Sequence, residues 1–348
     1  MLKILMYNVR PDEQTPLDAW VEKNGIQVDT NSVPLNAETV DLAKGYDGIV
    51  IQQHGPVADP AIYEKLHSFG IKQITLRITG YEIIDFDQAK KNDLVVTNVP
   101  AYSPRSVSEL VLADVMGLLR HIGEVGEREK HGDFSWKGVE AREIHTLTVG
   151  IIGAGKIGSA VARIFRALGA TVIAADPIHR PELNDTLTYV DHETVFKTAD
   201  IVTMHTPLTD ETQHMINAAV LKEMKPSAIF INASRGPVVD TPALVAALEN
   251  KEIAAAAIDT FEGENTIVGQ DLTGQEIDND SLKKLLAMPN VNVTPHIGFY
   301  TEVAVQNMIE IALNDVVTIL NGEKSPHQVG GCDCFSGGTL CQELSLRC

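Results

Sequence analysis

Short apolar runs alternate with longer segments of helical periodicity along most of this chain. In the first hundred residues, apolar runs bounded by glycine or polar turns predict strands, and apolar positions three or four residues apart predict helices. The predicted strands are 2–6, 48–52, 73–78 and 94–98, and the predicted helices are 17–24 and 61–68. Strands that alternate with helices are typical of βαβ units, so this part should form a parallel sheet covered by helices.

The same alternation starts again after a polar stretch at residues 131–142. One long helix is expected before this stretch, over residues 106–129. Six strands are expected after it, at 147–152, 171–175, 201–204, 228–232, 254–259 and 291–294. A last helical run over 302–320 ends at the stop signal Asn321-Gly322 and is expected to pack back on the first unit. The pattern therefore predicts an α/β protein of two units.

Composition and charge limit the classes of function. A length of 348 residues fits about two domains, and a hydrophobic content of 44% excludes a mainly disordered chain. The net charge of −19 disfavours nucleic acid and anionic membrane as partners. The sequence lacks an apolar run of membrane-spanning length, and its N-terminus lacks a signal-peptide pattern. We therefore expect a cytoplasmic protein.

All four cysteines lie at the C-terminal end of the chain. They are Cys332, Cys334, Cys341 and Cys348. The rest of the chain has no cysteine, so its core is expected to fold without disulfides. The C-x-C spacing could bind a soft metal. The alternative is that residues 331–348 are a non-native or disordered extension, and we favour this alternative, so no metal site is predicted.

One glycine-rich stretch carries the most specific local signal. Its G-x-G-x-x-G glycines are Gly153, Gly155 and Gly158. In a dinucleotide-binding turn, these glycines permit the tight turn, the close approach of a pyrophosphate and the packing of helix on strand. The amides of Lys156 and Ile157, at the start of the following helix, would meet the phosphates. A glycine turn without a ligand is the alternative, but the complete β-α-β context favours a dinucleotide.

Asp176 ends the strand that follows this helix. A carboxylate at this position accepts hydrogen bonds from the adenosine ribose and repels a 2′-phosphate. NAD is therefore expected in preference to NADP. Arg180 lies close by in sequence and could counteract this preference, although it comes after the end of the strand.

Three further polar stretches follow predicted strands of the second unit, at 232–236, 259–264 and 294–296. In an open parallel sheet, ligands bind beyond the carboxyl ends of the strands. Taken singly, Arg235 could be a surface ion-pair partner, Glu262 or Glu264 a solvated charge, and His296 a buried structural histidine. Together they favour a polar reaction on an anionic substrate. His205 also ends a strand, where we expect a supporting role near the cofactor.

With these motifs, the chain resembles the D-isomer-specific 2-hydroxyacid dehydrogenases, and among them the bacterial D-lactate and D-2-hydroxyisocaproate enzymes. The motifs are NVPAYSP (98–104), VGIIGAGKIG (149–158), HTPLTDETQHMIN (205–217), MKPSAIFINASRGPVVDT (224–241), IDTFEGE (258–264) and PNVNVTPHIGFYT (289–301). The resemblance implies a Rossmann nucleotide-binding domain, 101–298, inserted in a flavodoxin-like substrate domain, 1–100 with 299–330.

The resemblance also implies roles for individual residues. Arg235 would bind the substrate carboxylate and carbonyl, His296 would be the acid/base, and Glu264 would partner His296. Further cofactor positions would be Thr206, Pro207, Thr212, Ala233, Ser234 and Asp259. The backbone at Thr79 and Gly80 would receive the substrate carboxylate, and the side chains of Tyr102 and Phe299 would line the pocket.

The expected activity is the NAD-dependent, reversible reduction of 2-keto acids such as pyruvate to D-2-hydroxy acids, in a homodimer. Many D-lactate enzymes have a tyrosine just before a Gln-Gln pair, whereas here Ile51 precedes Gln52-Gln53. We therefore expect room for larger branched or aromatic substrates. A second departure is the segment 80–85, which differs from the usual G-x-D-N-I-D. An NAD-sensing interaction protein of the same fold, or a hydroxypyruvate or glyoxylate reductase, are the alternatives.

Overall fold

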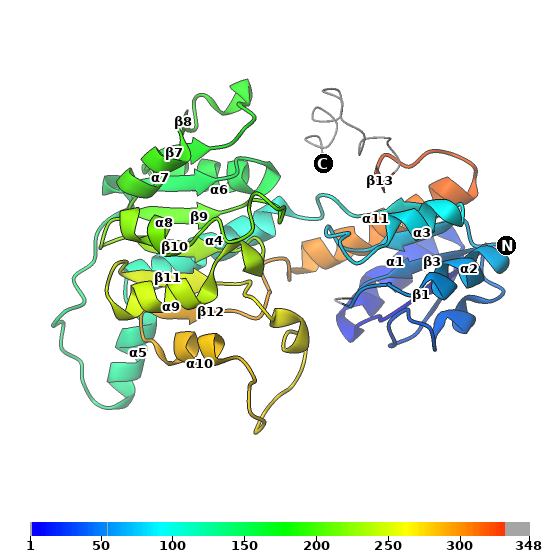
Figure 1. Cartoon of the computed structure of the whole chain (residues 1–348), viewed down its shortest axis with the longest axis horizontal. Coiled ribbons are helices and arrows are strands. Elements are labelled where there is room, and N and C mark those ends of the chain that lie inside the picture. Colours follow the sequence, from blue (N-terminus) through cyan, green and yellow to red (C-terminus); the bar gives the residue numbers. More distant parts are fainter. Residues whose placement is uncertain (1, 54, 331–348) are drawn as a thin grey trace. The chain divides into compact units, whose positions relative to one another are not determined.

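The computed structural model describes residues 2–53 and 55–330. The predictions about the cysteine tail therefore lie outside the described residues. The described chain divides into two compact units, one that contains residues 2–103 and 301–330 and one that contains residues 104–300 (Figure 1). The second unit is thus a continuous stretch of chain that interrupts the first, and each unit contains its own sheet.

The sheet of the first unit has strand order β2-β1-β3-β4-β5-β13. Its strands are β1 (Lys3–Met6), β2 (Gln27–Thr30), β3 (Gly48–Ile51), β4 (Gln73–Leu76), β5 (Val95–Thr97) and β13 (Gln328–Val329). The first five strands are parallel and follow the flavodoxin-like order 2-1-3-4-5. The strand β13 runs antiparallel to β5. The pattern of apolar positions did not predict β2 or β13.

Helices cover both faces of this sheet. They are α1 (Gln14–Asn24), α2 (Pro60–Ser68), α3 (Phe86–Lys91) and α11 (Glu302–Leu320), with 3-10 turns η1 (Pro11–Glu13) and η2 (Val40–Ala43). On one face, Trp20 of α1 and Leu313 of α11 pack with Ile4 and Val50 of the strands. By length and composition α11 could cross a membrane, but half of its apolar stretch is buried in the unit, as in a core helix.

The sheet of the second unit is parallel throughout, with order β8-β7-β6-β9-β10-β11-β12. Its strands are β6 (Thr148–Ile152), β7 (Thr171–Ala175), β8 (Thr188–Tyr189), β9 (Ile201–Met204), β10 (Ile229–Asn232), β11 (Ala255–Ile258) and β12 (Val291–Val293). Renumbered within the unit, this is the Rossmann order 3-2-1-4-5-6 with one strand added. The predicted fold class, two α/β domains on doubly wound parallel sheets, is confirmed.

The helices of the second unit also form two layers (Figure 1). Its helices are α4 (Pro104–Leu119), α5 (Ile122–Lys130), α6 (Lys156–Ala167), α7 (His192–Thr198), α8 (Ala218–Glu223), α9 (Thr241–Glu249) and α10 (Asp280–Ala287). Short 3-10 turns are η3 (Ile144–Thr146), η4 (Pro181–Leu183), η5 (Gly236–Val238) and η6 (Glu264–Thr266). Apolar residues of α4 and α6 fill one face of the sheet, and those of α7 to α10 fill the other.

The predicted single helix over 106–129 is wrong. The helix α4 ends at Leu119, and α5 begins only after His121, whose φ of 53° is left-handed and interrupts the helical backbone. The apolar face of α4 packs on the sheet, whereas α5 has no buried residue. The segment at α5 contains Gly123 and Gly126 and is rich in charge, so neither packing nor helix propensity favours continuing α4 in a straight line.

Candidate active site

The glycine turn joins β6 to α6 at the point where the strand order of the sheet reverses. A Cβ atom at Gly153, whose φ is 91°, would lie 2.6 Å from the carbonyl oxygen of His205. A Cβ atom at Gly158 would lie 2.0 Å from the carbonyl oxygen of Gly153. A Cβ atom at Gly155 would meet nothing within 4 Å. The outer two glycines are therefore required by packing, and the middle one borders open space that a ligand can approach.

Polar atoms without partners lie at the same reversal of strand order. His205 Nδ1 and Thr206 Oγ1 are buried and have no hydrogen-bond partner in the described structure, whereas His205 Nε2 lies 2.9 Å from Thr203 Oγ1. Burial lowers the pKa of His205 to about 3, so its ring is neutral. Unpaired buried polar atoms at the mouth of a glycine turn fit a bound polar ligand such as a dinucleotide. A neutral His205 agrees with the expected supporting role.

Asp176 follows β7 and faces the glycine turn. Its carboxylate accepts hydrogen bonds from the backbone N–H of Ala154 at 2.6 Å and of Ile178 at 2.7 Å. Arg180 Nη1 lies 3.4 Å from the same carboxylate. The guanidinium is thus paired with Asp176, and its charge is partly compensated where a 2′-phosphate would need a free cation.

The strongest chemical arrangement is a histidine–carboxylate pair. His296 follows β12, Glu264 begins η6 after β11, and His296 Nδ1 donates to Glu264 Oε1 at 2.9 Å. Because an ionised carboxylate can only accept, this bond keeps a proton on Nδ1 of the ring and fixes the ring orientation. The ring nitrogen Nε2 is left for exchange of a proton with a ligand. The ring of Phe299 stands edge-on to His296 with centroids 6.4 Å apart.

Asp259 holds the backbone on which His296 is mounted. Its buried carboxylate accepts from Thr294 Oγ1 at 2.6 Å, from the N–H of Ile297 at 2.8 Å and from the N–H of Gly298 at 2.9 Å. The backbone N–H of His296 donates to the carbonyl of Asp259 at 2.9 Å. Sequence reasoning assigned Asp259 only to the cofactor and missed this scaffold function. The left-handed φ of 55° at His296 is one reason a scaffold is needed.

Arg235 lies on the loop after β10, at the same edge of the sheet. Its Nη1 donates to the carbonyl of Ser234 at 2.9 Å. Asn232, another residue that sequence reasoning did not single out, is almost fully buried and donates from Nδ2 to the carbonyls of Arg235 and Thr260, each at 3.1 Å. Asn232 therefore ties the loop that carries Arg235 to the loop that leads to Glu264.

The remaining cofactor positions predicted for this unit also follow its strands. They are Lys156 and Ile157 at the start of α6, Thr206, Pro207 and Thr212 after β9, and Ala233 and Ser234 after β10. The hydroxyl of Thr212 donates to the carbonyl of Pro207 at 2.7 Å and closes the turn after β9. Their roles in binding the cofactor stay predictions.

The substrate positions predicted in the first unit follow β4 and β5. Thr79 Oγ1 donates to the carbonyl of Val99 at 2.9 Å, and Asn98 Nδ2 donates to the carbonyl of Thr79 at 2.6 Å. These two bonds fix the backbone that leads into Gly80. The carbonyl of Tyr102 accepts from Asn307 Nδ2 at 2.6 Å. The backbone around Thr79 is therefore held rigidly by the loop after β5.

Ile51, the residue from which we expected room for larger substrates, lies in the core of the first unit. Its side chain has no exposed surface and belongs to the core with Tyr7 and Leu76, because it points into the layer opposite α1 and α11. The next residue along, Gln52, is half-buried and accepts from Arg10 Nη1 at 2.7 Å. The alternation of side chains along a strand could have pointed to Gln52, since the residue that follows Ile51 faces the opposite side of the sheet.

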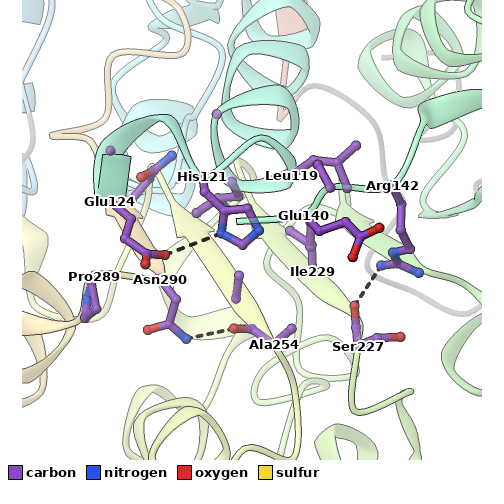
Figure 2. A pocket seen from close by; sticks show the side chains of 16 residues that line it. Leu119, His121, Glu124, Glu140, Arg142, Ser227, Ile229, Ala254, Pro289 and Asn290 are labelled. Carbon is purple, nitrogen blue, oxygen red and sulfur yellow. Dashed lines mark hydrogen bonds and ion pairs between the residues drawn. The ribbon is translucent and has the colours of Figure 1, made fainter. Parts of the chain in front are cut away.

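A separate cavity of about 220 Å³ opens at the opposite edge of the second sheet (Figure 2). It is lined by residues before the strands or at their first positions, among them Ser227, Ile229 and Ala254, and by His121 and Arg142. None of the predicted site residues lines it. In the described part of the chain, no cluster of three or more His, Cys, Asp or Glu side chains could hold a metal ion.

Comparison with known proteins identifies the same family that the sequence motifs resemble. The family model described as D-isomer specific 2-hydroxyacid dehydrogenase, NAD binding domain, matches residues 112–298. A D-lactate/D-glycerate dehydrogenase of Pediococcus acidilactici is 40% identical over 94% of this chain and 99% of its own length.

Two solved structures are also similar. A D-isomer specific 2-hydroxyacid dehydrogenase from Lactobacillus delbrueckii ssp. bulgaricus, in its NAD complexed form, has a TM-score of 0.86, 47% identity, and coverage of 94% of this chain and 99% of its own. A D-lactate dehydrogenase from Sporolactobacillus sp. has a TM-score of 0.85, 55% identity and the same coverage.

Proposed function

Because this chain belongs to the D-isomer-specific 2-hydroxyacid dehydrogenase family, we propose that it is an NAD-dependent enzyme that reversibly reduces 2-keto acids such as pyruvate to D-2-hydroxy acids. The observation that carries this proposal is the bond of 2.9 Å between His296 and Glu264. That pair lies beyond the same sheet edge as Arg235 and the glycine turn, which fits proton transfer beside a dinucleotide.

Each residue then has a chemical task. When bound, NADH supplies the hydride. His296 donates a proton from Nε2 to the carbonyl oxygen of the substrate as negative charge develops there, and Glu264 orients the imidazole for that transfer through its bond to Nδ1. Arg235 suits the substrate carboxylate because its planar guanidinium can donate two parallel hydrogen bonds. The backbone at Thr79 and Gly80 of the first unit is also proposed as a substrate-binding position.

We propose that NAD is held by residues at the glycine turn and at the strand ends beside it. Gly155 borders open space, and Thr206 presents a buried hydroxyl without a partner. Asp176 is proposed to accept hydrogen bonds from the adenosine ribose. Asp259 is proposed to contact the nicotinamide end in addition to holding the His296 loop.

The range of substrates needs its own proposal. The expectation of larger side chains depended on Ile51, which is buried in the core. We propose that Gln52, bonded to Arg10, is the residue of this strand end that influences the choice of substrate. Catalytic efficiencies on pyruvate, hydroxypyruvate, 2-ketoisocaproate and phenylpyruvate, measured for the native enzyme and for Gln52→Leu, test this assignment.

We further propose a cytoplasmic homodimer that does not bind nucleic acid or membrane. Support for self-association comes from the second unit, where Ile122 is 62% exposed, Phe134 is 72% exposed and Trp136 is 90% exposed. Large apolar side chains exposed together in one segment are typical of a protein interface. Light scattering after size exclusion should give a dimer mass, and Trp136→Ser should shift the population toward monomer.

The central experiment follows NADH absorbance in the presence of a panel of 2-keto acids. The native protein should oxidise NADH, whereas His296→Gln should lose about 10²–10⁴-fold in kcat with little change in NADH binding. Arg235→Lys should raise KM for the keto acid and lower kcat, because lysine cannot reproduce the bidentate contact. An NAD-sensing protein without catalysis would bind NADH and show no turnover with any keto acid.

A further inference from the structure

Glu262 is the acidic residue of the stretch after β11 that has no assigned task. Its Oε1 lies 2.7 Å from His214 Nε2, and its Oε2 accepts from the N–H of Thr241 at 3.4 Å. His214 lies on the segment after β9, and Thr241 is the first residue of α9. One carboxylate therefore bridges two elements that are separate in sequence, directly beside the turn that carries Glu264.

The position of Glu264 is determined by that turn. Its Oε2 accepts from the backbone N–H of Phe261 at 3.1 Å, while its Oε1 accepts from His296. Gly263 adopts a left-handed φ of 81°, which lets the chain reverse between Phe261 and Glu264. A displacement of the turn would thus displace the carboxylate from the imidazole that it serves.

The turn itself is anchored at Glu262. The carbonyl of Glu262 accepts from Asn279 Nδ2 at 3.0 Å. On its other side, a Cβ atom at Gly236 would lie 2.3 Å from the carbonyl carbon of Phe261, so the loop of Arg235 packs directly on the turn. The backbone anchors fix one side of the turn, and the side chain of Glu262 is the link to the segment after β9.

His214 is itself held in place. Its φ of 49° is left-handed, and its backbone N–H donates to the carbonyl of Pro237 at 2.8 Å. The hydrogen bond to Glu262 raises the pKa of His214, which favours the charged form of the pair. Asp240 is the other carboxylate that acts on this imidazole. The pair therefore joins the loops that follow β9, β10 and β11.

We infer that Glu262 and His214 form a positioning pair that keeps the Glu264 carboxylate within bonding distance of His296, an inference that rests on the proposed dehydrogenase function. The pair touches neither reacting group and acts only through the turn. A partly exposed ion pair with no such task would contribute little to stability and nothing to turnover. The two possibilities differ in whether the effect of Glu262 depends on Glu264.

A double-mutant cycle on kcat separates them. Glu262→Ala alone should lower kcat about 10-fold, because a misplaced catalytic group loses rate steeply with distance. NADH binding, followed by its fluorescence, should stay within about 2-fold of native, since the glycine turn and Asp176, which are proposed to hold the phosphates and the ribose, lie on other loops. In a Glu264→Gln background, Glu262→Ala should lower kcat by no more than about a further 2-fold, because the group that it positions has lost its charge.

Further variants guard against a loss of folding. Glu262→Gln keeps an acceptor for His214 and should recover most of the lost rate, and His214→Gln should resemble Glu262→Ala. The matched control is Glu143→Ala, which removes a His–Glu pair of 3.4 Å with His145 elsewhere in the same unit and should leave kcat unchanged. Thermal unfolding of each variant verifies that it is folded, and His214→Gln replaces Glu262→Ala in the cycle if the alanine variant is not.

The outcomes separate the two proposals. Equal fold-losses for the Glu262 change with and without Glu264, or native kcat in folded Glu262→Ala, would overturn the positioning pair and leave the dehydrogenase function intact. A native enzyme that reduces none of the keto acids would overturn the function itself. A non-additive cycle supports the positioning pair.

Discussion

Replacing Asp259 with asparagine tests how strictly the His296 loop depends on one carboxylate. The native carboxylate accepts three hydrogen bonds of 2.6 to 2.9 Å, from a hydroxyl and two backbone amides. An asparagine has one acceptor oxygen, and its amide nitrogen would face the N–H of Ile297 or of Gly298. At least one bond to a charged acceptor is lost and the others weaken, which should cost about 2–4 kcal/mol of folding free energy.

The same change should lower catalysis. His296 directly precedes Ile297 and Gly298, whose amides bond the Asp259 carboxylate, and its own N–H bonds the Asp259 carbonyl. Loss of one of these bonds therefore displaces the imidazole. A displacement of about 1 Å corresponds to a loss of roughly 100-fold in kcat. Urea unfolding measures the first effect, and steady-state reduction of pyruvate measures the second.

The matched control is Asp200→Asn. Asp200 also accepts three hydrogen bonds, from the N–H of Thr148 at 2.9 Å, from Arg142 at 3.0 Å and from Lys225 at 3.1 Å, but it lies at the opposite edge of the same sheet. It should lose stability and retain native kcat. Native kcat in Asp259→Asn, or an equal loss of kcat in both variants, would refute the reasoning.

Four further variants test stability and the cofactor site. Burial raises the pKa of Asp114 to about 6 from an unfolded value of 3.8, so its contribution to stability is fully present below the lower value and is lost as pH rises through the higher one. Asp114→Asn should therefore reduce the pH dependence of urea unfolding by roughly 1–3 kcal/mol across this window, and an unchanged dependence would contradict it. Gly158→Ala should lower both the Tm and the affinity for NADH, the latter about 10-fold or more, because its Cβ would lie 2.0 Å from a carbonyl oxygen. Gly155→Ala meets open space and should weaken NADH binding at native Tm, so equal melting of the two variants would count against the assignment. Asp176→Ala should narrow the preference for NADH over NADPH in steady-state assays, and an unaltered ratio would remove Asp176 from the ribose site.

Much of the fold could be predicted because burial and local pattern agree. The run that becomes β6 is almost fully buried, and the glycines after it favour a dinucleotide-binding turn in a β-α-β context. In the strands that the sequence did not predict, burial and local pattern do not agree. The strand β2 is half-exposed, and β8 and β13 have two residues each and form only because a neighbouring strand is already in place.

The candidate site divides in the same way. The residue types at strand ends and the family resemblance identified Arg235, Glu264 and His296, but spacing alone cannot pair a histidine with a carboxylate 32 positions away. Scaffold bonds are still less visible in a sequence, because they depend on where loops cross. Asn232 and the second task of Asp259 therefore emerged only from the folded arrangement.

The interrupted first unit has a consequence for synthesis on the ribosome. Its sheet is complete up to β5 once residue 97 has been made, but α11, which covers one face together with α1, follows only after the entire second unit. At 5–20 residues per second, roughly 200 intervening residues delay α11 by about 10–40 s. During that interval Ile4, Met6 and Val50 have no helix α11 to cover them. The nascent chain thus presents an apolar surface to chaperones long before the second unit is finished.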